Sequence, residues 1–205
     1  ISSPAPLRES CGLPPDGFVF CSFNNNFKFT PEMFDTWMNI LGRVPNSVLW
    51  LLSANPWAEE NLKKRATTFG IHEDRLVFSP RVSPEDYLAK YLVADLFLDT
   101  FPFNAGTTAN DVLWMGLPIL TLSGKTFASR MAGALLTAAG IEELITYDIK
   151  SYEEKAVHLA SFPEYLLDIR QKLKEVREKG ALFDTEKFAR NLENKFMNLM
   201  NRASP

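Results

Sequence analysis

The stretch ADLFLDTFPFNAGTTANDVLWMGLPILTL, residues 94–122, decides the fold. Its two ends, 94–99 and 118–122, are short apolar runs that predict buried strands. Between them, 107–115 has helical character and stops at Gly116, a residue type that commonly ends helices. Strands with little polar alternation are typical of a parallel sheet covered by helices on both faces. The stretch therefore predicts the strand–helix–strand unit of an α/β protein.

The same alternation extends in both directions along the chain. Thr30 before a proline and Ser83 before a proline are both typical N-caps, so a helix is expected to begin at each. The other expected strands are 18–23, 47–52, 75–78 and 144–146, and the other expected helices are 58–69 and 127–139; the helix from Thr30 is expected to end near Arg43. A strand and a helix that recur about every 25–30 residues predict a Rossmann-like, doubly wound parallel sheet.

Three regions are expected along the chain. Residues 1–17 contain four prolines, which predict an irregular lead-in or linker. Residues 18–150 form the sheet domain, and 151–205 form a helical C-terminal tail that packs on it. Within the tail, an apolar stripe recurs at helical spacing and is expected to pack against a neighbour; it consists of Phe188, Leu192, Phe196 and Leu199.

Composition and charge limit the function classes. The mixture of 46% hydrophobic and 23% charged residues excludes wholesale disorder, and a net charge of −3 disfavours a nucleic-acid partner. No apolar run has the length of a membrane span and no signal peptide is recognisable, so no membrane partner is expected. Since the sequence begins at Ile1, we expect a piece of a longer protein. Cys11 and Cys21 lack zinc or redox spacing, which predicts a buried free thiol at Cys21 and a reducing, cytoplasmic compartment.

Candidate binding residues follow the strands, because ligands of open parallel sheets bind beyond the carboxyl ends of the strands. Residues 24–28 (NNNFK) offer amides and Lys28 as donors after the first strand; a solvated polar turn is the alternative. This segment has no G-x-G-x-x-G loop, and the sequence has no Walker motif. The missing glycine loop disfavours a dinucleotide oxidoreductase. No acidic cluster of the receiver type is recognisable either.

The segment after the fourth expected strand has the features of an anion site. Gly106 allows close backbone approach, and Thr107 and Thr108 open a helix whose first N–H groups attract phosphate. Asp111 lies four residues after Thr107, where a carboxylate would accept hydrogen bonds from sugar hydroxyls. A plain helix start with an acid in its first turn explains the same pattern.

Two further segments offer weaker signals. Tyr87 is suited to stack on a base and Lys90 to donate to it, although a packed tyrosine and a surface lysine of an amphipathic helix explain them equally. Residues 123–126 (SGKT) offer further N–H donors for phosphate. His72 and His158 do not have the setting of a general base, and no metal-ligand cluster is recognisable. A catalytic base and a metal are therefore not expected within this chain.

Several segments, taken in order, closely resemble the C-terminal half of the O-linked N-acetylglucosamine transferase family, which includes the plant Spindly-type proteins and many bacterial tetratricopeptide-repeat proteins. The segments are 18–28, 44–52, 78–80, 94–100, 104–108, 111–114 and 124–130, and the resemblance covers roughly 14–200. A bacterial tetratricopeptide-repeat member fits best. The resemblance implies the C-terminal lobe of a GT-B glycosyltransferase, in which two Rossmann-like lobes face each other and no metal is needed.

The resemblance also implies roles for individual residues. Lys28 matches a lysine that contacts the diphosphate and supports departure of the leaving group; it is the implied catalytic residue. The implied nucleotide-binding residues are Asn25 (diphosphate), Val82 (base, through its backbone), Tyr87 and Lys90 (base), Thr107 and Thr108 with the adjoining Gly106 (phosphate), and Asp111 (ribose). Two positions depart from the animal enzymes: Gly106 replaces a histidine, and Pro84 replaces a ribose-contacting lysine.

The leading hypothesis is the donor-binding lobe of a metal-independent glycosyltransferase. It would move N-acetylglucosamine from UDP-N-acetylglucosamine to Ser or Thr hydroxyls of an acceptor protein. The alternatives are a GDP-fucose-dependent protein O-fucosyltransferase lobe and an inactive nucleotide-binding or scaffold module. The N-terminal lobe and the tetratricopeptide repeats lie outside these residues, so the chain alone is expected to be inactive.

Overall fold

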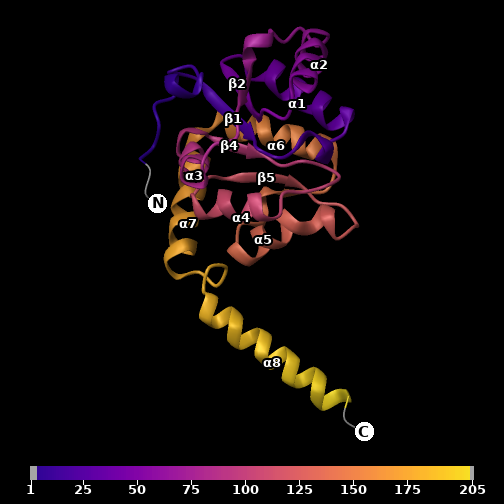
Figure 1. Ribbon diagram of the computed structural model, residues 1–205, viewed down its shortest axis with the longest axis vertical. Coiled ribbons are helices and arrows are strands. Elements are labelled where there is room, and N and C mark those ends of the chain that lie inside the picture. Colours follow the sequence, from indigo (N-terminus) through magenta and orange to yellow (C-terminus); the bar gives the residue numbers. More distant parts are fainter. Residues whose placement is uncertain (1–3, 204–205) are drawn as a thin grey trace.

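The computed structural model describes residues 4–203, and its centre is one parallel sheet (Figure 1). The strand order is β3-β2-β1-β4-β5-β6. The strands are β1 Phe18–Ser22, β2 Ser47–Leu52, β3 Leu76–Ser79, β4 Leu96–Leu98, β5 Ile119–Leu122 and β6 Ile145–Thr146. This order is that of doubly wound nucleotide-binding sheets, in which the chain reverses its direction of travel between the neighbours β1 and β4. The predicted doubly wound parallel sheet is confirmed.

Helices cover both faces of the sheet. They are α1 Pro31–Arg43, α2 Pro56–Thr67, α3 Pro84–Lys90, α4 Thr107–Trp114, α5 Met131–Ala139, α6 Ile149–Ser161, α7 Pro163–Lys179 and α8 Thr185–Ala203. Figure 1 shows α1 and α6 on one side of β4 and β5, with α4 and α5 on the other. None of the helices within residues 4–203 is long and apolar enough to cross a membrane.

Capping side chains set most helix starts. The Thr30 hydroxyl accepts a hydrogen bond from the Met33 amide at 3.3 Å, as the sequence predicted. Asn55 caps α2, so this helix begins at Pro56, two residues before the predicted start. The helix predicted from Phe127 instead begins with the 3-10 turn Ala128–Arg130, and α5 follows from Met131.

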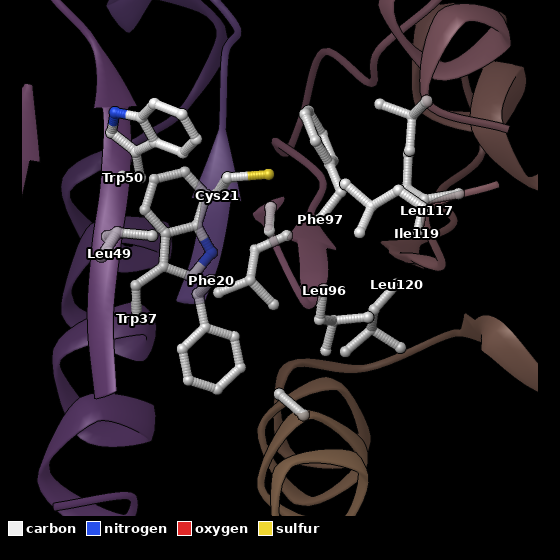
Figure 2. Close-up of a cluster of buried hydrophobic side chains, with 14 of the residues drawn as sticks. Phe20, Cys21, Trp37, Leu49, Trp50, Leu96, Phe97, Leu117, Ile119 and Leu120 are labelled. Atoms are coloured by element: carbon white, nitrogen blue, oxygen red, sulfur yellow. The ribbon is translucent and has the colours of Figure 1, made fainter. Parts of the chain in front are cut away.

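The core lies on both faces of the central strands (Figure 2). Trp37 of α1 is fully buried beside Phe20 of β1, and its indole N–H donates to the Tyr152 hydroxyl at 3.3 Å. The same hydroxyl donates to the carbonyl of Asp99 at 3.0 Å. These two bonds join α1 and α6 to the carboxyl end of β4. Cys21 is a buried free thiol, as predicted, and burial raises its pKa.

The lead-in is irregular, as predicted, but it is bound to the sheet domain. The Arg8 guanidinium donates to the Asp95 carboxylate at 2.9 Å and to the carbonyls of Gly17 and Val93 at 2.9 and 3.1 Å. Leu13 belongs to the buried core. Residues 4–17 therefore cover part of the domain and are not a free linker.

The helical tail packs on the domain only in part. Helices α6 and α7 contribute buried side chains such as Tyr152 and Leu173. Helix α8 extends away from the domain (Figure 1). Its apolar stripe is exposed: Phe188, Leu192, Phe196 and Leu199 are 66, 41, 56 and 60% exposed. The prediction that this stripe packs against a neighbour is wrong within the described chain, because α8 touches no second layer there.

Candidate functional site

A cleft of about 470 Å³ lies beyond the carboxyl ends of the strands. Its walls come from the segments after β1 and β3, from the last residue of β2, and from helices α3 and α4. Ligands of doubly wound sheets bind at this edge. Of the nine residues predicted from the sequence, six line it: Asn25, Val82, Tyr87, Lys90, Thr108 and Asp111. The other three, Lys28, Gly106 and Thr107, lie outside its lining, although 106 and 107 directly precede Thr108 on the chain.

The segment after β1 is partly buried, so it is not a solvated polar turn. The Asn24 amide nitrogen donates to the Thr100 hydroxyl at 3.1 Å, and Asn24 itself is 4% exposed. Because Thr100 follows β4, this bond links the exits of the two central strands. Asn25 is left half-buried and lines the cleft.

Lys28 ends a 3-10 turn, Asn26–Lys28, next to this junction. Its ammonium group lies 3.4 Å from the Asn24 side-chain oxygen and 4.5 Å from the centre of the Phe103 ring. Burial lowers the Lys28 pKa, and the nearby Asp99 carboxyl acts in the opposite direction. The side chain is thus held in place by an amide and a ring.

Asp99 organises the loop that leads from β4 to α4. One of its carboxyl oxygens accepts from the amides of Thr100 and Ala105 at 2.8 and 2.7 Å, and the other accepts from the Thr121 hydroxyl at 2.7 Å. The carboxyl is fully buried, and this burial raises its pKa to about 7. These bonds tie the loop before α4 to Asp99 and, through Thr121, to β5.

Helix α4 begins at Thr107, as the sequence predicted. Gly106 is the N-cap and contributes no side-chain bond to the first-turn amides. A Cβ at Gly106 would lie 3.4 Å from the Met131 Cε atom, in contact with the end of that side chain. The cleft is lined by Thr108 together with Asp111, one turn further along, and not by Thr107. Burial raises the pKa of the Asp111 carboxyl.

The opposite wall is formed by α3 and the segment before it. Tyr87 is half-buried, its hydroxyl accepts a short hydrogen bond from Tyr91, and burial raises its pKa to about 12. The Lys90 ammonium donates to the Ser79 hydroxyl at 2.6 Å and to the Pro80 carbonyl at 3.3 Å. Burial lowers the Lys90 pKa. Val82, which is 40% exposed, also lines this wall. The wall therefore presents aromatic, apolar and cationic groups to the cleft.

Arg81 lines the cleft and was missed by the sequence analysis. Its guanidinium donates to the Asn25 side-chain oxygen at 2.8 Å. The available signal was its position two residues after β3, at the edge of the sheet where ligands bind.

The weaker candidates do not join the cleft. In 123–126, the amides of Gly124 and Thr126 donate to the carbonyl and hydroxyl of Ser129, at 2.8 and 3.1 Å, so they are already occupied. His72 caps a 3-10 turn at the surface, and His158 packs against the rings of two aromatic residues. In the described part of the chain, no group of three acidic, histidine or cysteine side chains gathers as a metal site would.

Comparison with known proteins gives consistent matches. The family model of Glycosyl transferase family 41 matches residues 4–192. The chain is 38% identical to the probable UDP-N-acetylglucosamine–peptide N-acetylglucosaminyltransferase SEC of Arabidopsis thaliana, over 96% of this chain and 20% of that protein. It is 36% identical to the corresponding enzyme of Caenorhabditis elegans, over 91% of this chain and 16% of that protein.

A solved structure agrees with these matches. The mutant K341M of the Thermobaculum terrenum O-GlcNAc transferase superposes with a TM-score of 0.84 and 30% identity, covering 91% of this chain and 38% of that one. The chain thus spans about a fifth of the length of the curated relatives it matches.

Proposed function

This chain belongs to glycosyl transferase family 41 and has the fold of the C-terminal lobe of GT-B glycosyltransferases, and on that premise we propose that it is the donor-binding lobe of a sugar transferase. The proposed donor is UDP-N-acetylglucosamine, and the proposed acceptor is a Ser or Thr hydroxyl of a protein. The names of the relatives from Arabidopsis and Caenorhabditis support this donor. We also propose a cytoplasmic location, which the free thiols of Cys11 and Cys21 support.

The observation that carries the proposal is the order of groups around the cleft. Tyr87 and Lys90 offer a ring and a cation suited to a base. Asp111 offers carboxylate oxygens suited to ribose hydroxyls, and the adjacent start of α4 offers N–H groups suited to phosphate. The base would therefore lie against α3, the ribose against Asp111 of α4, and the diphosphate between the start of α4 and Lys28.

The chemistry that this arrangement supports is stabilisation of a leaving group. An acceptor hydroxyl attacks the anomeric carbon, the bond from that carbon to the phosphate oxygen breaks, and its electron pair stays on the diphosphate. Lys28 and the first amides of α4 would meet the growing negative charge as fixed donors, without a divalent ion. The hydroxyl proton would go to a base outside this chain.

Calorimetric titration of the chain tests the proposal. UDP and UDP-N-acetylglucosamine should bind, NAD should not, and chelation of divalent ions should leave the affinity unchanged. Preferential binding of GDP and GDP-fucose would instead assign the O-fucosyltransferase alternative. Absence of binding to every nucleotide would refute the donor-lobe proposal and leave a scaffold module.

A second measurement addresses activity. The chain alone should not transfer radiolabelled N-acetylglucosamine to a Ser/Thr peptide, because we propose that the base and the acceptor surface belong to residues outside it. Turnover by these 205 residues would contradict that expectation.

A further inference from the structure

Arg81 reaches across the edge of the cleft to a segment far away in the sequence. It follows β3, whereas its partner Asn25 follows β1, and β2 lies between these strands in the sheet. The backbone of Arg81 therefore belongs to the α3 side of the cleft, while its guanidinium is held at the exit of β1, 2.8 Å from the Asn25 side-chain oxygen. Lys28 belongs to the same exit, and its amide donates to the Asn25 carbonyl at 3.1 Å.

The charge of Arg81 is not neutralised by this contact. Lys90, the other cation in the cleft lining, has its ammonium bound to Ser79 and Pro80. Within the described residues, Arg81 has the neutral Asn25 oxygen as its side-chain partner, at one of its guanidinium nitrogens. A guanidinium has five N–H donors in a planar fork, so most of them are left for another acceptor. Arg81 is exposed and lines the cleft, where such an acceptor would arrive.

We propose that Arg81 binds the diphosphate of the nucleotide donor, exchanging the Asn25 oxygen for phosphate oxygens. The inference rests on the proposed function, and it adds a cation from the α3 side to the donors proposed at Lys28 and at the start of α4. The planar fork fits two phosphate oxygens at once, which a point-like ammonium does not. Asn25 would hold the guanidinium at the correct end of the cleft before the donor arrives, so that less side-chain freedom is lost on binding.

The test compares Arg81→Gln and Arg81→Lys with the parent chain by calorimetry, using UDP, GDP and their nucleosides. Arg81→Gln should weaken binding of the preferred nucleoside diphosphate by about 10-fold or more, as loss of a charge-assisted contact does. Binding of the nucleoside should be unchanged, because it has no phosphate. Arg81→Lys should retain part of the affinity, since it keeps the charge and loses the fork.

Arg190→Gln is the matched control, because Arg190 is an exposed arginine of α8 paired with Glu186. It should leave every affinity unchanged, and the melting temperature of each variant shows that it is folded. If the parent binds a nucleoside diphosphate and Arg81→Gln binds it equally, the inference is wrong while the proposed function stands. If Arg81→Gln loses as much affinity for the nucleoside as for the nucleotide, the inference is also refuted, because Arg81 would then contact the base or the ribose. If the parent binds no nucleotide, both the proposed function and the inference fall.

Discussion

Replacing Lys28 with alanine removes the cation that we expect to oppose the leaving diphosphate. A hydrogen bond between an ammonium and a charged phosphate contributes about 1.5–3 kcal/mol, and each 1.4 kcal/mol changes affinity about tenfold. Lys28→Ala should therefore weaken UDP or GDP binding by roughly 10- to 150-fold. The nucleoside should bind the variant and the parent alike, because it carries no phosphate.

The structure adds a stability cost to this substitution. Lys28 lies 4.5 Å from the centre of the Phe103 ring and 3.4 Å from the Asn24 oxygen. A partly exposed cation–π contact contributes about 0.5–1 kcal/mol to the free energy of unfolding. The hydrogen bond to Asn24 is too long to add much to it. For a chain of this length, a loss of about 1 kcal/mol lowers the melting temperature by about 2–4 °C. Lys28→Met should recover part of this loss by packing on the ring, without recovering nucleotide affinity.

The pH dependence of binding gives an independent check. Burial lowers the Lys28 pKa, so the ammonium loses its proton at a lower pH than an ordinary lysine does. Nucleotide affinity should therefore decline as pH rises, starting below the usual lysine range, and Lys28→Ala should remove this part of the decline.

Calorimetry with nucleotide and nucleoside on both proteins decides the matter, with Lys64→Ala as the control because Lys64 is an exposed residue of α2 paired with Glu60. Unchanged nucleotide affinity in Lys28→Ala would refute the reasoning and remove the main support for metal-free leaving-group stabilisation.

Three further outcomes are expected. Asp111→Asn should weaken UDP binding while hardly changing the binding of inorganic pyrophosphate, because the carboxylate is expected to accept from ribose; equal losses in calorimetry would show that it only holds the helix. Burial raises the pKa of Asp99 to about 7, against about 3.9 when unfolded, so the folded chain holds an extra proton between these values. Its stability to denaturant should therefore fall as pH rises through that interval, and Asp99→Asn should flatten this part of the profile; an unaltered slope would contradict the assignment. Deletion of 185–205 should shift the melting temperature by less than about 3 °C, because the apolar stripe of α8 is exposed, and a larger drop would show that α8 stabilises the domain.

The order of strands and helices was predictable from the sequence because it depends on local patterns. Short apolar runs form the buried strands, and Thr30 and Ser83 cap the helices that follow them. The gathering of six predicted residues in one cleft was also predictable in outline. Carboxyl ends of parallel strands lie at one edge of a sheet, so residues that follow the strands come together whatever their distance along the chain.

Contacts between particular side chains were decided by the tertiary structure. Arg81 and Asn25 are 56 residues apart, and their meeting depends on the strand order and on how far each loop extends. Whether Thr107 or Thr108 lines the cleft depends on the rotation of α4 about its axis, and the loop before this helix is bound to Asp99. Local sequence contains no information on either, because both result from long-range packing.

Helix α8 shows the same division at the level of a whole element. Its sequence determines an amphipathic helix, since the apolar residues recur with the helical period. An apolar stripe shows that one face of a helix is suited to burial. The surface that would cover this face is formed by other residues, so the helix sequence does not specify it. Only the tertiary structure could decide that α6 and α7 complete the domain while α8 extends from it, because burial requires a second surface at the right position in space.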